Sequence, residues 1–246
     1  MKSPFPIPYC LNVHPAANWR EVKRALSVHA LAVKRLVAPD RPFPLSLHLG
    51  YKTALELATP CRRAAFRDWL RRHDCFVAGV NAFPFGPFHG ATVKTAVYRP
   101  DWRSDGRLAY TLLVARLLAD LIPEGAEATL TTVPGGWLPD WKTAADRRQA
   151  LENLARAAVG CRELFESTGR RIRIAVEPEP GCAWDLFDPE VEAAGPEIGW
   201  CLDVCHAAVE FQTIDKLDWS RIVRVQLSSA IECDNVPTAR AALAPF

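Results

Sequence analysis

The sequence lacks the features that mark nucleic-acid-binding, secreted and membrane-spanning proteins. Its 30 Lys and Arg residues nearly balance its 28 Asp and Glu residues, and a formal net charge of +2 gives no basic footprint for nucleic acid. Prolines interrupt the N-terminal stretch MKSPFPIPYCLNV, where a secretory signal would carry an apolar run. The longest apolar stretch, residues 108–122, is too short to span a bilayer and contains Arg116 and Asp120. We therefore expect a cytoplasmic protein with no membrane span and no nucleic-acid partner.

Several catalytic signatures are missing as well. The sequence has no G-x-S-x-G nucleophile elbow, no Walker phosphate loop and no H-E-x-x-H metalloprotease helix. No glycine-rich phosphate loop follows the first predicted strand, which argues against a dinucleotide-binding sheet. Eight cysteines in 246 residues without a secretory signal indicate reduced thiols and not a disulfide framework. The excess of 23 Arg over 7 Lys suggests GC-rich codons and hence a bacterial source.

Short strand-like runs alternate with longer helical patterns along the whole chain. The predicted strands are residues 7–13, 45–49, 76–82, 128–133, 172–177, 198–203 and 222–227. The predicted helices are residues 19–37, which open after Asn18 as N-cap, 61–72, 107–122, 143–167 and a short one near 207–212. A repeated strand–helix order is typical of parallel strands with right-handed crossovers. The sequence therefore predicts an α/β fold, a (β/α) TIM-type barrel, in which residues 1–246 form a single domain.

The predicted barrel is incomplete. A closed barrel of this type has eight strands, whereas seven are recognisable here, and the chain ends about twenty residues after the seventh. We therefore expect the eighth strand to be missing or atypical and the domain to be truncated at its C-terminus. An open barrel exposes strand edges, so a closing segment or a partner chain, as in a homo-oligomer, is expected to cover them.

Alternate residues of the predicted strands divide into an apolar set and a set that ends in polar side chains. The apolar set is expected to face outward beneath the helices: Tyr9, Leu11, Val13, Leu45, Leu47, Leu49, Ile174, Val176, Trp200, Leu202, Val223, Val225 and Leu227. The other set is expected to face inward and to end at the C-terminal rim, where TIM barrels carry their catalytic groups. Its last members are Asn12, His14, His48, Asn81, Thr131, Glu177, Asp203 and Gln226.

Four of the rim residues, on three consecutive strands, point to a metal site. Glu177, Asp203, His206 and Gln226 would lie side by side, and their oxygen and imidazole groups suit Mn²⁺, Mg²⁺, Co²⁺ or Zn²⁺. A buried carboxylate needs a partner, because an unpaired one is costly. That partner is either a divalent cation or an inward-facing arginine such as Arg173 or Arg224.

Structural roles compete with functional ones at several of these positions. A lone inward His48 is more often a hydrogen-bonded barrel residue than a ligand, and asparagines at loop starts can satisfy backbone groups. Cys201 and Cys205 have a spacing tolerable for zinc, with Cys182 and Cys233 as further candidates. Cys201 lies one layer below Asp203 and no second tight pair exists, so buried reduced thiols are the better interpretation.

The longest stretch without periodicity, residues 83–104, follows the third predicted strand and is rich in aromatic residues and proline. A loop of this length inside a compact domain is usually functional. We expect His89 and Lys94 within it to contact substrate, together with Asn12, His14, His48 and Asn81 at the rim. The loop either covers the substrate and excludes water or packs as a cap of its own.

Some of these motifs resemble those of a known superfamily. VEPEP at 176–180, CLDVCH at 201–206 and VQLSS at 225–229 resemble the rim motifs of the xylose isomerase-like TIM barrels, which include sugar isomerases, sugar-phosphate epimerases and endonuclease IV-type enzymes. More specifically, NAFPFGPFHG, VYRPDW, TTVPGGW and CLDVCHAAVEF resemble the metabolite traffic protein EboE family over essentially the whole chain. That resemblance implies a role linked to moving a precursor metabolite.

The superfamily pattern also implies roles for individual residues. It implies that Glu177 is a metal ligand and an acid or base, that Asp203 is a ligand, and that His206 acts in the same site. Gln226 stands where the pattern usually has a histidine ligand, and its amide oxygen is neutral and weaker. The glutamate usual on an eighth strand has no counterpart here, so the chain supplies one of the two carboxylates that such epimerases place on opposite faces of the substrate.

Three functions follow from these observations. The leading hypothesis is a divalent-metal protein that acts on a small polyhydroxylated or phosphorylated metabolite by isomerase- or epimerase-type proton transfer. The alternative is a non-catalytic metabolite-binding or traffic protein on the same fold, which Gln226 and the missing eighth strand favour. The third, an endonuclease IV-like phosphodiesterase, is disfavoured because the rim has few histidines and the chain has no basic face.

Overall fold

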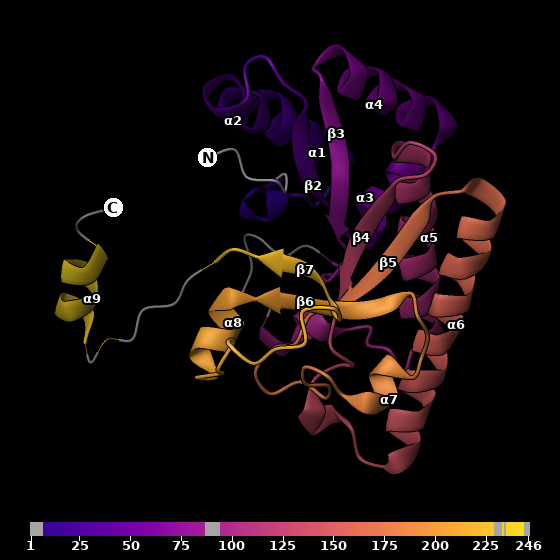
Figure 1. The fold of residues 1–246 in the computed structure, drawn as a ribbon, viewed down its shortest axis with the longest axis vertical. Helices are drawn as coiled ribbons and strands as arrows, with labels where there is room; N and C mark the ends of the chain where they lie inside the picture. The colour runs from indigo at the N-terminus through magenta and orange to yellow at the C-terminus, as the bar shows by residue number, and fades with distance from the viewer. Residues whose placement is uncertain (1–6, 87–93, 229–232, 234, 244–246) are drawn as a thin grey trace.

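The computed structural model describes residues 7–86, 94–228, 233 and 235–243. Seven parallel strands form one sheet in the order β1 to β7, and this sheet curls into a half-barrel (Figure 1). The strands are β1 (Tyr9–Cys10), β2 (Phe43–His48), β3 (Cys75–Asn81), β4 (Glu127–Thr132), β5 (Arg171–Val176), β6 (Ile198–Asp203) and β7 (Ile222–Gln226). The predicted TIM-type α/β fold is confirmed, and so is its incompleteness, because β1 and β7 do not pair within the described residues.

The first strand is much shorter than the predicted 7–13. Only Tyr9 and Cys10 pair with β2, and Leu11–Val13 turn into a 3₁₀ helix, η1. Pro8 has no N–H to donate to a ladder, and short apolar runs do not by themselves distinguish a strand from a turn. Asn12 and His14 therefore lie in and after a turn instead of at the end of a strand.

The first predicted helix is present but not uniform. α1 (Trp19–Ala25), a π-helical segment η2 (Leu26–Ala30) and α2 (Leu31–Val37) together cover residues 19–37. The Asn18 side chain accepts a hydrogen bond from the Glu21 backbone N–H at 3.1 Å, as expected of the N-cap. A π-helical turn inside an α-helix is rare and frequently marks a functional position.

The later helices follow the prediction in part. They are α3 (Tyr51–Ala58), α4 (Pro60–Arg72), η3 (Lys94–Tyr98), α5 (Asp105–Leu121), η4 (Leu138–Asp140), α6 (Ala144–Thr168), α7 (Pro189–Glu192), α8 (Val204–Val209) and α9 (Val236–Leu243). α3 was not predicted, and α8 begins three residues before the predicted 207–212 because Asp203 caps it. None of the helices among the described residues combines the length and apolarity that a bilayer crossing needs.

Most of the outward-facing strand residues form the core under the helices. α5 and α6 lie side by side along the sheet (Figure 1), and Leu45, Leu47, Ile174, Val176 and Trp200 are completely buried. The prediction is wrong at the two open edges of the sheet, where burial needs a neighbouring strand or helix that the described chain does not place there. The exposed residues are Val13 at 68%, Val225 at 41% and Leu227 at 73%.

An arginine occupies the interior of the half-barrel. Arg224 of β7 donates from Nη2 to Ser46 Oγ of β2 at 2.6 Å and from Nη1 to Thr129 Oγ1 of β4 at 3.3 Å. At Gly79 of β3, a Cβ atom would lie 2.6 Å from Arg224 Nη1, so the arginine needs a glycine there. Arg224 therefore faces inward as predicted and joins the two sides of the curled sheet.

The long stretch after β3 is anchored in the core where it is described. Phe85 stacks on Tyr51 with ring centroids 4.6 Å apart, and fully buried Trp102 donates from Nε1 to Val133 O at 3.1 Å. These contacts favour the packed-cap interpretation for its two ends. The predicted residue His89 lies outside the described residues, and Lys94 begins η3 with a side chain that is likewise outside the described part.

Candidate metal and active site

Three metal-ligating side chains converge at the C-terminal rim of the sheet. Glu177 directly follows β5, Asp203 ends β6, and His206 lies in the helix α8 that begins after Asp203. One ligand atom from each lies within 4.8 Å of the other two. Neighbouring parallel strands end at the same edge, so the fold brings together residues that the sequence separates.

Glu177 is the most unusual member of this group. Its side chain is 5% exposed, and Oε2 is buried without a hydrogen bond from any described residue. Arg224 donates instead to Ser46 and Thr129, and no ion pair joins Glu177 to Arg173 in the described chain. Burial, followed by the charges of Glu179 and Asp203, raises the pKa of Glu177 to about 8, although the charge of Arg224 and the side chain of Gln226 oppose the shift. A divalent cation would supply the contact that Oε2 lacks, so the residues fit a metal.

Asp203 has a structural role beside any functional one. Its Oδ1 accepts hydrogen bonds from the backbone N–H groups of Cys205 at 2.8 Å and His206 at 3.2 Å, and from Ser228 Oγ at 2.6 Å. The carboxylate is therefore the N-cap of α8. All three bonds use Oδ1, which leaves Oδ2 for a cation.

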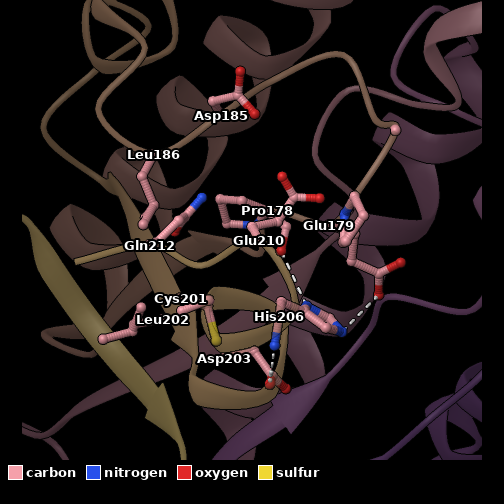
Figure 2. Close-up of a pocket in the computed structure, with 13 residues that line it drawn as sticks. Pro178, Glu179, Asp185, Leu186, Cys201, Leu202, Asp203, His206, Glu210 and Gln212 are labelled. Carbon is pink, nitrogen blue, oxygen red and sulfur yellow. Dashed lines mark hydrogen bonds and ion pairs between the residues drawn. The ribbon is translucent and has the colours of Figure 1, made fainter. Parts of the chain in front are cut away.

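His206 is held in an orientation suited to binding a metal. Its Nδ1 lies 3.0 Å from the carbonyl oxygen of Pro178, and because a carbonyl only accepts, Nδ1 carries the proton. The lone pair is then on Nε2, which lies 3.7 Å from Glu179 Oε1. Figure 2 shows the His206 ring between Asp203 and Glu179. Metal-binding histidines commonly have such a carbonyl partner on the second nitrogen.

Glu179 is a third carboxylate at the site, and the sequence alone did not indicate its role. It lines the same pocket as Asp203 and His206 (Figure 2), and its Oε2 accepts a hydrogen bond from Tyr98 Oη at 2.6 Å. Burial raises the pKa of Glu179 above its ordinary value, although Tyr98 and His206 oppose the shift. The signal was present in VEPEP, since Glu179 is two residues after Glu177. Its contact with Tyr98 depends on the path of the loop after β3, which no local pattern gives.

Asn12 and Gln226, two further predicted rim residues, contact each other, and Gln226 also lies close enough to Glu177 to lower the pKa of its carboxyl. Asn12 Nδ2 lies 3.5 Å from Gln226 Oε1, and Gln226 Nε2 lies 3.6 Å from Cys201 Sγ. The amide oxygen proposed as a ligand thus faces Asn12, and the metal-binding role of Gln226 stays a prediction.

His48 and Asn81 are buried neighbours in the register of β2 and β3. Asn81 Oδ1 accepts from the Phe83 N–H at 2.9 Å, which is the loop-capping role that competed with substrate binding. His14 Nε2 lies 2.8 Å from Tyr9 Oη, and its ring stacks on His29 at 4.3 Å. None of the three belongs to the group of metal-ligating side chains found among the described residues, and their contact with substrate stays a prediction.

The competing cysteine site receives no support from the described residues. All eight cysteines are free thiols, and the one group of metal-ligating side chains found there contains no cysteine. Cys201 is fully buried and faces inward one layer below Asp203, as expected, and burial raises the pKa of its thiol well above the ordinary value. A buried, protonated thiol is a poor zinc ligand.

The raised pKa of Glu177 predicts how the stability of the metal-free protein depends on pH. The folded protein favours the protonated form of the Glu177 carboxyl. The contribution of Glu177 to stability is therefore complete below the ordinary pKa of 4.5 and is lost as the pH rises to about 8. We expect the free energy of unfolding of chelator-treated protein to fall over this interval, by at most about 1.4 kcal/mol per pH unit for one proton. Urea unfolding of the parent and of Glu177→Gln at a series of pH values checks this, since the free energy of unfolding of the variant should depend less steeply on pH. An equal pH dependence in the two proteins would contradict the prediction.

Comparison with solved structures defines the fold. The chain is similar to a xylose isomerase domain protein from Planctomyces limnophilus, with a TM-score of 0.56 and 14% identity over 80% of this chain and 66% of that one. It is also similar to a xylose isomerase-like TIM barrel protein from Mycobacterium smegmatis in complex with magnesium. The TM-score is 0.55, with 13% identity over 82% of this chain and 66% of that one. The fold is that of the xylose isomerase-like TIM barrels. The chain spans about two thirds of the length of these two proteins.

Proteins with different names share this fold. An AP endonuclease of family 2 from Brucella melitensis matches with a TM-score of 0.51 and 17% identity over 89% of this chain and 84% of that one. At such identities the likeness establishes fold alone. Comparison of the sequence with protein-family models and with curated proteins finds no match. The xylose isomerase-like resemblance is thus supported at the level of fold, and the narrower EboE resemblance stays a prediction.

Proposed function

We propose that Glu177, Asp203 and His206 hold one divalent cation and that the chain acts on a small polyhydroxylated or phosphorylated metabolite by isomerase- or epimerase-type proton transfer. The observation that carries this proposal is the buried Glu177 oxygen without a partner, in a group whose ligand atoms lie within 4.8 Å of one another. Two carboxylates and an imidazole are a donor set suited to Mn²⁺, Mg²⁺, Co²⁺ or Zn²⁺. The magnesium complex of the Mycobacterium protein supports a cation of this kind on this fold.

The residues around the cation divide the chemistry between them. When bound, the cation polarises a carbonyl or hydroxyl oxygen of the substrate and so acidifies the neighbouring C–H group. Glu179 would take up that proton at Oε1 and return it to a carbon of the same substrate, while the hydrogen bond from Tyr98 holds Oε2 in place. Burial raises the pKa of Glu179, and a base with a pKa nearer the working pH is the more effective one. Pro178 fixes the His206 ring through Nδ1.

The dimensions of the pocket limit what enters it. The cavity lined by Glu179, Asp203 and His206 measures about 40 Å³, which accommodates a cation with one water molecule or one substrate oxygen. The rest of a sugar-sized metabolite would lie above the rim. The proposal therefore assigns recognition of one oxygen-bearing group to these residues.

A hydrogen-exchange experiment tests the proposed reaction. The protein loaded with Mn²⁺ or Mg²⁺ is incubated in D₂O with a panel of ketoses, aldoses and their phosphates, and deuterium incorporation next to the carbonyl is followed by NMR. We expect metal-dependent exchange with at least one compound, and a loss of about 100-fold or more in Glu179→Gln. Tyr98→Phe keeps the carboxylate and removes one hydrogen bond, so it is the matched control and should lose about tenfold.

Two results would change the conclusion. Exchange that persists in chelator-treated protein would show that the reaction needs no cation and would refute the proposal. Saturable metabolite binding without exchange would favour the alternative, a metabolite-binding or traffic protein. The Asn12–Gln226 contact favours that alternative, because it engages the amide oxygen that a cation would otherwise use.

A further inference from the structure

A second cavity lies on the outer face of the half-barrel, between α1 and α4. It measures about 240 Å³ and shares no residue with the pocket at the rim. Trp19 of α1 and Phe66 and Trp69 of α4 form its apolar wall. Exposed residues at its edge, among them Lys23, Ser27 and Arg72, leave the cavity open to solvent.

The three rings of the wall pack against one another. Trp19 meets Phe66 edge to face with centroids 5.0 Å apart, and Phe66 stacks on Trp69 at 6.1 Å with 26° between the ring planes. Trp19 and Phe66 are buried at 6% and 3% exposure, so their positions are fixed by the core. Trp69 is half-buried and leaves part of its ring accessible. Rigid rings of this kind favour a flat, apolar ligand at low entropic cost.

Positive charge surrounds this wall. Lys23, Arg62 and Arg72 line the cavity, and all three are exposed. Arg62 pairs with Glu56 at 3.0 Å, whereas Lys23 and Arg72 form no ion pair with any residue that the structure describes. Two cations without a carboxylate partner beside an apolar wall attract an anion and repel a cation. The chemistry of the cavity thus calls for a ligand with an apolar body and a negative group.

The π-helical segment η2 forms another part of the wall. Its residues Leu26 and Ser27 line the cavity, and Leu26 is buried at 1% exposure while Ser27 is exposed. The sequence between 19 and 37 has an uninterrupted α-helical pattern, so the irregular turn is not dictated by proline or glycine. π-Helical turns frequently occur at functional sites. Here the turn contributes the exposed Ser27 to the lining of the cavity, together with Lys23 and Arg72.

We propose that this cavity binds a small organic anion with an aromatic body, such as an aryl phosphate or aryl carboxylate. The ring lies against Trp19, Phe66 and Trp69, and the anionic group lies between Lys23 and Arg72. A volume of about 240 Å³ corresponds to roughly eight water molecules, enough for one or two fused rings. The site is separate from the proposed metal site and stands without it.

Isothermal titration with 1-naphthyl phosphate tests the proposal, using chelator-treated protein so that the rim site holds no cation. We expect saturable binding of one molecule per chain with quenching of tryptophan fluorescence. 1-Naphthol and inorganic phosphate should each bind at least about tenfold more weakly, because 1-naphthol lacks the anionic group and inorganic phosphate lacks the aromatic rings. The double variant Lys23→Glu, Arg72→Glu should lose about tenfold or more in affinity.

The double variant Arg24→Glu, Arg67→Glu is the matched control, because it reverses two exposed arginines on the same helices that do not line the cavity. It should bind within about twofold of the parent. Equal losses in both variants, equal binding of 1-naphthol, or no saturable binding would each overturn the proposal. Concentration-dependent dimerisation that only the Lys23, Arg72 variant abolishes would also overturn it, since a second chain would then cover the cavity.

Discussion

Replacing Glu177 with glutamine is expected to lower the affinity of the protein for Mn²⁺ by about a hundredfold or more. Glutamine keeps the shape of the side chain and removes its charge at a position that is 5% exposed. Close charges at a partly buried site attract by about 4 kcal/mol even when the effective dielectric constant is 20, which corresponds to several hundredfold in affinity. Titration calorimetry of the chelator-treated parent and variant measures the difference.

Glu179→Gln is the control for this experiment. It removes a carboxylate that lines the pocket beside Asp203 and His206 and is not one of the three proposed ligands, so Mn²⁺ affinity should fall by about tenfold at most. Asp203→Asn is a third informative variant, because the asparagine side chain still offers an oxygen to cap α8 but lacks the negative charge of Asp203. Equal losses in Glu177→Gln and Glu179→Gln would show a general electrostatic effect and would contradict the assigned ligand set.

Replacing Arg107 with methionine is expected to lower the free energy of unfolding by about 3 kcal/mol or more. Arg107 of α5 is completely buried and donates to the carbonyl oxygens of Pro100 at 2.8 Å, Ala82 at 3.1 Å and Phe83 at 2.9 Å. Burial lowers the pKa of the guanidinium to about 10, so it stays charged at neutral pH. Methionine fills similar space but leaves buried carbonyl groups unpaired, at about 1–3 kcal/mol each.

Urea unfolding checks this prediction, with Arg116→Met as the control. Arg116 lies on the same helix and is exposed, so its replacement should change the free energy of unfolding by no more than about 0.5 kcal/mol. Because Arg107 ties both ends of the long loop after β3 to α5, its loss should also disturb Tyr98 and hence the Glu179 contact. An Arg107→Met protein within about 1 kcal/mol of the parent would show that the loop does not depend on this anchor.

The central strands could be predicted from sequence because they obey a period of two. Ser46 and Thr129 face inward, and Leu47 and Ile174 face outward, as the alternation requires. The same alternation places Glu177 inward at the rim beside Asp203, without any knowledge of the fold's details. The period carries this information since each strand of a curled sheet has one interior and one exterior face.

Other features depend on tertiary contacts and could not be predicted. The exposure of Val225 follows from the open edge at β7, and the early start of α8 follows from the Asp203 cap. The contact between Tyr98 and Glu179 joins residues 81 positions apart and rests on the path of a loop without periodicity. Local patterns specify which way a side chain points, whereas partners on different loops are specified only by the packed chain.

The most direct test of the account is the binding of divalent cations to the chelator-treated, folded protein. Titration calorimetry with Mn²⁺, Mg²⁺, Co²⁺ and Zn²⁺, confirmed by elemental analysis after gel filtration, measures affinity and stoichiometry. We expect about one cation per chain for at least one of these metals, with proton release because Glu177 must lose its proton to bind. A monodisperse, folded protein that binds none of the four would contradict the metal site and, with it, the proposed reaction.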